Sequence, residues 1–312
     1  MIKYQHILVI IDPNMEAQPA LYRAAEVARL QEQVAIQVFM TIYDFSYEIT
    51  SILSVEERDE MRAGVVQQRQ SWLEELVAPY KEEGLDITLK VVWHNRPSES
   101  ILQEIEQGGH DLVIKSAHQH SLLETFIFTP LDWQLIRKCH VPLLLVKEHE
   151  WPANGNVLVA LNFSNEPDQV ALNKKLFREG SQVARLVKSN LHLVNAVPAP
   201  TVNIALEVPG FTPELYNEAI RQHHVSMMEA FAAEHHVLPA HTHVLDGLPE
   251  DVLPELAEKL DAQLVMLGSV GRTGWSAALI GNTAEQVVDN IHCDLLVVQP
   301  DPGDNEDEKT IG

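Results

Sequence analysis

Three glycines near the C-terminal end of the chain have a spacing that could hold an anion. Two residues separate Gly268 from Gly271, and nine more separate Gly271 from Gly281, which gives the pattern G-x2-G-x9-G. Glycines let the main chain approach a ligand closely, and the first amides of a helix attract anions. A strand that enters this segment and a helix that leaves it would therefore predict a phosphate-binding loop.

The flanking residues predict that strand and that helix. The apolar run Leu264–Leu267 ends at the first glycine, and apolar residues with helical spacing follow from Asn282 to Ile291. Asn282 is the predicted N-cap, and Glu285 is placed to complete a capping box. The pattern is neither GxxxxGK(S/T) nor GxGxxG, so it differs from the common nucleotide loops. A glycine-rich turn without a ligand is the alternative interpretation.

Composition limits the partners that this chain can have. The 312 residues include 45 acidic and 22 basic residues, for a formal net charge of -23. A field of that sign repels nucleic acid, so we expect no nucleic-acid partner, and a bound polyanion would depend on backbone donors and Mg2+. No apolar stretch is long enough for a membrane span and no leader is recognised, which predicts a cytoplasmic protein. The single cysteines, Cys139 and Cys293, form no zinc or redox motif.

The chain contains an internal repeat. Apolar strand runs alternate with helical patterns in both halves, which is typical of a parallel sheet with helices on both faces. The segment Lys147–Gly155 interrupts the alternation and is a predicted linker. A gap-free comparison of the halves pairs Pro97 with Pro249, Leu112 with Leu264, Leu143 with Leu295 and Val146 with Val298.

The glycine pattern, within the run GSVGRTGWSAALIGNTAEQVVDNI, resembles the ATP-binding signature of the universal stress protein family. The resemblance covers essentially the whole chain and implies two Rossmann-like α/β domains, each a five-stranded parallel sheet flanked by helices. It places the domains at residues 1–147 and 156–300, ahead of an acidic tail at 301–312. It also implies a pseudo-dimer in which the domains meet along Leu143–Val146 and Leu295–Gln299, and further oligomerisation would be compatible with it.

The resemblance implies a cytoplasmic stress-response protein that binds ATP, with Mg2+ as its companion, in the second domain. Slow hydrolysis could accompany binding, but the sequence identifies no catalytic residue. Asn162 stands where the family usually has Asp, and Val194 matches a position that contacts adenine, with ordinary strand core as its alternative. The implied site residues are Gly268, Val270, Gly271, Arg272, Gly281, Asn282, Thr283, Asn162 and Val194.

The first half has lost the glycine pattern. Ser116, Gln119 and Thr129 stand opposite the three glycines, and Pro130 takes the position of the expected N-cap residue. We therefore predict no nucleotide in the first domain. Two interpretations remain for this half: a structural partner for the second domain, or a scaffold that holds an apolar or acyl-bearing molecule beside Leu122, Leu123, Phe126, Ile127 and Phe128.

Histidines concentrate in the second half. A surface zinc site is geometrically conceivable there, but no HExxH motif or cysteine partner supports it. Solvated imidazoles are the ordinary interpretation, so we predict no metal site of the protein's own. The residues concerned are His223, His224, His235, His236, His241 and His243.

Overall fold

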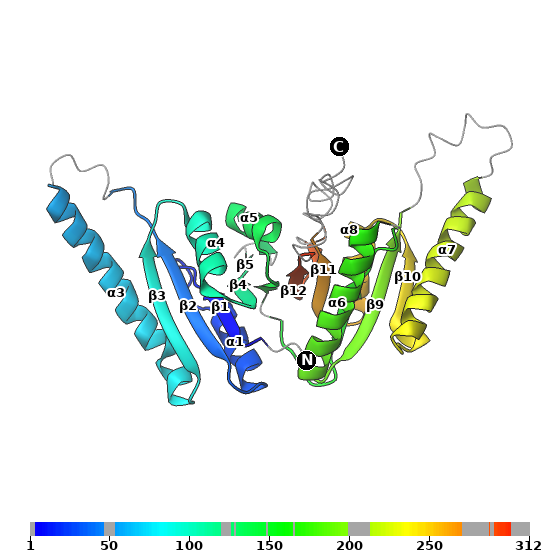
Figure 1. Cartoon of the computed structure of the whole chain (residues 1–312), viewed down its shortest axis with the longest axis horizontal. Coiled ribbons are helices and arrows are strands. Elements are labelled where there is room, and N and C mark those ends of the chain that lie inside the picture. Colours follow the sequence, from blue (N-terminus) through cyan, green and yellow to red (C-terminus); the bar gives the residue numbers. More distant parts are fainter. Residues whose placement is uncertain are drawn as a thin grey trace, which may run out of the picture. The chain divides into compact units, whose positions relative to one another are not determined.

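The computed structural model describes residues 4–46, 54–119, 126–127, 129–147, 149–164, 166–198, 213–269, 287 and 290–300. The chain forms two compact units, and the main division falls between Glu148 and His149. Figure 1 shows both units with their elements labelled. Each unit is an α/β domain with its own parallel sheet, as the alternation in the sequence predicts.

The first domain has a five-stranded sheet in the order β3-β2-β1-β4-β7, and the neighbouring strands in this order are parallel. A separate two-stranded ladder pairs β5 with β6. In chain order the elements are β1 His6–Ile10, α1 Pro19–Arg29, β2 Ala35–Ile42, α3 Val55–Glu82, β3 Asp86–Trp93, α4 Pro97–Gly108, β4 Leu112–Ser116, β5 His118–Gln119, β6 Phe126–Ile127, α5 Pro130–Lys138 and β7 Leu143–Val146.

The second domain repeats this order with strands β10-β9-β8-β11-β12, again parallel. Its elements are β8 Asn156–Ala160, α6 Pro167–Leu186, β9 Asn190–Val197, α7 Pro213–Glu234, the short 3-10 helix η2 Pro239–His241, β10 Thr242–Asp246, α8 Pro249–Lys259, β11 Ala262–Gly268 and β12 Asp294–Val298.

The sequence specifies these elements through buried runs and proline starts. All residues of β4, β7 and β12 are buried, as expected for strands that are covered on both faces. Proline fixes the backbone angle of the first helical residue and lacks only an amide that would have no helical partner there. Among the described helices, α1, α4, α5, α6, α7 and α8 begin with proline.

Strand register confirms the repeat that the sequence predicts. Ser116 at the end of β4 pairs with Val146 of β7, and Gly268 at the end of β11 pairs with Val298 of β12. Ser116 and Gly268 therefore occupy the same place in the two folds. The chain from Ser116 to Leu143 has the same length as the chain from Gly268 to Leu295.

The N-terminus of α5 differs by one residue from the sequence prediction. Thr129 is the N-cap of α5 and forms a capping box with Asp132, whereas Pro130 is the first helical residue. The prediction that Pro130 takes the N-cap place was wrong, because threonine caps well and proline is favoured one residue later. The predicted pairing of the two domains along their last strands stays a prediction.

Among the described residues, no helix combines the length and the apolar character that crossing a bilayer requires. The predicted glycine-segment residues Val270, Gly271, Arg272, Gly281, Asn282 and Thr283 lie outside the described residues, as does the acidic tail 301–312.

Candidate phosphate-binding site

Three of the predicted site residues lie at or near the carboxyl edge of the second sheet. Asn162 follows β8, Val194 lies on β9, and Gly268 ends β11. These strands are neighbours in the sheet, and the carboxyl ends of parallel strands are where α/β folds bind ligands. The structure therefore brings Asn162 and Gly268 to the same edge.

The turn that carries Asn162 is held by buried amides. Asn173 of α6 donates from Nδ2 to the Asn162 carbonyl at 2.8 Å and accepts from the Asn162 N–H through Oδ1 at 3.2 Å. Gln169 donates to the same Asn173 Oδ1 at 3.1 Å, which fixes the amide orientation. Asn173 and Gln169 are buried while Asn162 is exposed, so the main chain is locked and the Asn162 side chain faces solvent.

A second buried amide holds the residue before Asn162. Asn195 donates from Nδ2 to the Leu161 carbonyl at 2.9 Å, and its Oδ1 lies 2.7 Å from Nδ1 of His224 on α7. Because Asn195 Oδ1 can only accept, His224 Nδ1 carries the proton in this assignment. Burial, followed by the charge of His223, lowers the pKa of His224, which favours the neutral imidazole.

Sequence reasoning missed this supporting network. Its signal was present as polar residues within otherwise apolar patterns: Asn195 interrupts the strand run LHLVNAV, and Asn173 lies on the buried face of α6. Buried amides of this kind need hydrogen-bond partners. Their partners could not be named before the fold was known, since Asn195 and Leu161 are far apart in the chain.

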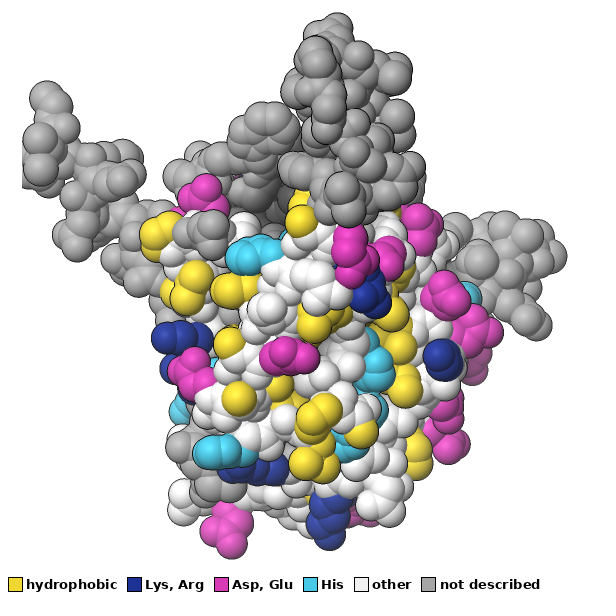
Figure 2. Space-filling view, turned by 90° about the vertical axis from the view of Figure 1, so that its right-hand side faces the viewer, with side chains coloured by type: hydrophobic (Ala, Val, Ile, Leu, Met, Phe, Trp, Pro, Cys, Tyr) yellow, Lys and Arg dark blue, Asp and Glu magenta, His cyan; other side chains and the backbone are white. Residues whose placement is uncertain are grey.

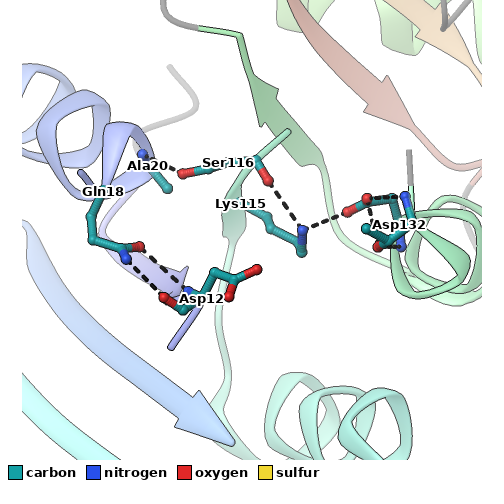
Figure 3. Close-up of polar contacts among 7 residues, drawn as sticks. Asp12, Gln18, Ala20, Lys115, Ser116 and Asp132 are labelled. Carbon is teal, nitrogen blue, oxygen red and sulfur yellow. Dashed lines mark hydrogen bonds and ion pairs between the residues drawn. The ribbon is translucent and has the colours of Figure 1, made fainter. Parts of the chain in front are cut away.

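The equivalent turn of the first domain is held by one side chain. Gln18 donates from Nε2 to the Asp12 carbonyl at 2.8 Å, and its Oε1 accepts from the Asp12 N–H at 3.4 Å (Figure 3). Both domains therefore fix the turn after their first strand, but with different residues. This shared restraint indicates that the turn conformation belongs to the fold rather than to one ligand.

Val194 contributes its side chain to the core. The side chain is fully buried, and the Val194 carbonyl accepts the N–H of Leu161 at 2.8 Å. A contact between Val194 and a base stays a prediction.

The packing of α6 against the end of β11 explains why residue 268 is a glycine. A Cβ atom at this position would lie 2.6 Å from Cδ2 of Leu172, closer than real Cβ atoms approach, and 3.0 Å from its Cγ. Leu172 is buried on α6, so the missing side chain lets this helix pack against the end of β11. Close helix–strand packing is thus a role of Gly268 that the glycine pattern alone did not reveal.

Gly268→Ala is expected to lower the free energy of unfolding by about 1–3 kcal/mol, because Leu172 must leave its preferred position. Gly64→Ala is the matched control, since a Cβ on Gly64 of α3 meets nothing within 4 Å. The control should gain roughly 0.5–1 kcal/mol from helix propensity. Urea unfolding of both variants measures the difference, and a neutral Gly268→Ala would contradict the packing role.

Acidic residues are present at the same edge. The first turn of α6 contains Asp168, and the first turn of α8 contains Glu250 and Asp251. The face drawn in Figure 2 shows acidic and basic side chains interspersed, with hydrophobic side chains scattered among them. A polyanion at this edge would therefore meet carboxylates as well as helix N-termini, and a companion cation would reduce the repulsion.

Several histidines of the second domain pack against other rings, and some of these rings are histidines. Among the described residues, no group of three or more His, Cys, Asp or Glu side chains is arranged to hold a metal ion. His192 Nδ1 lies 3.1 Å from His243 Nε2, and the His192 and His241 ring centroids are 4.5 Å apart. His235 stacks on Phe177 with centroids 4.2 Å apart. Several of these histidine rings therefore have a structural role, since they pack against other side chains of the domain.

Most residues of the predicted apolar pocket in the first half lie outside the described residues. Leu122, Leu123 and Phe128 lie outside the described residues, and Phe126 and Ile127 form the strand β6. The apolar-ligand interpretation stays a prediction.

Comparison with known proteins identifies the family. The profile of the universal stress protein family matches residues 3–147 and again residues 154–299, which together are most of the chain. The chain belongs to the universal stress protein family. It is 52% identical over 305 residues to universal stress protein E of Escherichia coli (strain K12), covering 96% of each chain.

Other relatives support the same conclusion for this universal stress protein. It is 38% identical over 308 residues to the universal stress protein E homolog of Haemophilus influenzae, covering 97% of this chain and 100% of the relative. Among solved structures, a putative universal stress protein from Pseudomonas aeruginosa UCBPP-PA14 superposes with a TM-score of 0.71 at 27% identity, covering 96% of this chain and 94% of the other. Both domains of the fold are thus shared along the full length.

Proposed function

We propose that this universal stress protein binds ATP, accompanied by Mg2+, in its second domain only. The observation that carries the proposal is the carboxyl edge of the second sheet. There the exposed Asn162, on a turn locked by Asn173, lies at the same edge as Gly268, where the G-x2-G-x9-G segment begins. Ligands of doubly wound α/β folds bind at this edge.

The residue types of the glycine segment favour a phosphate-bearing ligand that is held by backbone donors. Glycines at positions 271 and 281 keep side chains away from the main chain, and Asn282 and Thr283 add short polar groups. Arg272 supplies a guanidinium that pairs well with phosphate oxygens. Mg2+ prefers oxygen ligands and is commonly held by phosphates, so it would offset repulsion from Asp168 and Glu250.

The proposal is restricted to binding. Asn162 replaces a carboxylate that the family usually has, and an amide cannot act as a general base. Hydrolysis needs a positioned water or base in addition to phosphate contacts. We therefore propose ATP as a bound ligand of a cytoplasmic stress-response protein, with hydrolysis at most slow.

The test is ATP titration of the full chain by isothermal calorimetry in the presence of Mg2+. We expect one ATP per chain for the wild type. Gly271→Val and Gly281→Val should each weaken ATP binding at least about tenfold, which corresponds to a loss of roughly 1.4 kcal/mol of binding free energy.

Thr129→Val is the matched control, because Thr129 is the first-domain counterpart of Gly281. It removes the hydroxyl of the α5 cap without touching the glycine segment and should leave ATP affinity unchanged. Equal ATP affinity of the wild type and both glycine variants would reject the proposed site. Two ATP molecules per chain would reject its restriction to the second domain.

A further inference from the structure

The start of α5 in the first domain is occupied by a carboxylate of the chain itself (Figure 3). Asp132 is the third residue of α5, and its Oδ2 accepts the Thr129 N–H at 2.7 Å and the Thr129 Oγ–H at 2.8 Å. The Asp132 N–H donates back to Thr129 Oγ at 3.3 Å. The carboxylate thus lies at the positive end of the helix, where anions bind.

A buried cation lies on the other side of this carboxylate. Lys115 extends from β4, and its Nζ is 2.7 Å from Asp132 Oδ1 and 3.1 Å from the Ser116 carbonyl. The side chains of Lys115 and Asp132 are only 4% and 0% exposed. A charged group so deeply buried is retained only with a charged, hydrogen-bonded partner. Lys115 and the α5 cap therefore surround one carboxylate with three donor groups.

By residue type, the corresponding positions of the second domain carry neither the lysine nor the aspartate. Lys115 and Ser116 correspond by strand register to Leu267 and Gly268, and the gap-free comparison of the halves pairs Asp132 with Ala284. In the first domain Ser116 Oγ also accepts the Ala20 N–H of α1 at 3.0 Å. Two helix starts at the carboxyl edge of the first sheet are thus satisfied by the domain's own side chains.

We propose that Lys115 and the first turn of α5 form an oxyanion site whose resident ligand is the carboxylate of Asp132. Removing that side chain leaves a buried ammonium and the Thr129 donors facing a space the size of a carboxylate. The vacated site then takes a small free monocarboxylate of the size of formate. This inference concerns the first domain and does not depend on ATP binding by the second.

The experiment is chemical rescue of Asp132→Ala in the full chain. Thermal unfolding is followed while sodium formate is increased, against sodium chloride at equal ionic strength. We expect Asp132→Ala to unfold at a lower temperature than the wild type, and formate to raise its midpoint by about 3–6 °C more than chloride does. The wild type, whose site is filled, should respond equally to both salts.

The double variant Lys115→Met/Asp132→Ala separates specific binding from a general salt effect. It removes the cation together with the carboxylate, so formate should stabilise it no more than chloride. If Asp132→Ala does not fold in chloride, formate should restore folding, and the double variant should fold without formate. Equal responses of Asp132→Ala to formate and chloride, or equal rescue of the double variant, would overturn the proposal.

Discussion

Replacing Lys115 by methionine is expected to lower the free energy of unfolding of the first domain by about 3–5 kcal/mol. The substitution keeps most of the unbranched apolar side chain but leaves Asp132, which is 0% exposed, as a buried carboxylate without its cation. The Thr129 donors stabilise one oxygen only, since both hydrogen bonds go to Oδ2. The cost therefore comes mainly from an uncompensated charge rather than from lost attraction.

A double-mutant cycle measures that origin directly. Asp132→Asn alone should also be strongly destabilising, because it leaves the Lys115 ammonium buried without an anion. The double variant Lys115→Met/Asp132→Asn should recover most of the loss, since both charges are gone. Hydrogen exchange of the β4 and α5 amides in the full chain gives the local free energies.

The exposed ion pair Arg96–Glu99 is the control for this cycle. Its N–O distance is 2.8 Å, close to that of the buried pair, but the two side chains are 68% and 58% exposed. Arg96→Met should therefore cost about 0.5 kcal/mol or less, because water screens exposed charges. A similar small effect of Lys115→Met would show that the buried pair contributes no more than a surface pair.

Acidification is expected to destabilise the second domain through His192, by about 2 kcal/mol between pH 7 and pH 4.5. Burial, followed by the charges of His241 and His243, lowers the pKa of His192 to about 4. Burial also lowers the pKa of His243, with His241 and Lys259 contributing. The expected loss of unfolding free energy is smaller than the whole pKa shift of His192 would give, because His241 and His243 are partly exposed and water screens their charges.

The direction of this pH dependence follows from the number of protons that the folded and unfolded states bind. In the unfolded chain His192 titrates near its ordinary pKa of about 6.5, whereas the folded domain keeps it neutral down to about pH 4. The unfolded state thus binds more protons inside that window, so stability falls as the pH decreases through it. More than about one pH unit above that ordinary pKa, His192 is neutral in both states, and its contribution to stability no longer changes with pH.

His192→Gln isolates this contribution, because glutamine is the first-domain residue at the equivalent place, Gln37. Hydrogen exchange of the β9 and β10 amides should show a smaller loss of stability on acidification in His192→Gln than in the wild type. His292→Gln, at an exposed position, serves as the control. Identical acid sensitivity of His192→Gln and the wild type would contradict the role of His192.

The strands β1, β4, β7, β11 and β12 could be predicted from the sequence because their burial is nearly continuous. The predicted apolar run Leu264–Leu267 lies within β11, which spans Ala262–Gly268 and ends at the first glycine of the pattern. Apolar runs bounded by glycine, proline or charged residues carry this information locally. The repeat followed from the same runs, since equivalent strands recur in the same order.

The site was harder to predict from the sequence, because its polar residues contact partners that are distant in the chain. Lys115 at the end of an apolar run resembles an ordinary exposed strand terminus, yet it is buried against Asp132 from a different helix. Asn195 and Asn173 likewise support a turn that neither adjoins in the chain. A glycine pattern indicates where another group must approach the backbone closely, but it does not say whether that group is a ligand or a side chain. At Gly268 the group is the side chain of Leu172.

The equal lengths of the chain from Ser116 to Leu143 and from Gly268 to Leu295 have a consequence for engineering. Nearer their N-termini the two copies differ in length, since α1 has 11 residues and its counterpart α6 has 20. Residues 117–142 and 269–294 follow strands that pair in the same register with β7 and β12, so we expect that the two segments can be exchanged as cassettes. Transplanting the second cassette into the first domain, with Lys115→Leu and Ser116→Gly, would give a chain that carries the glycine segment twice.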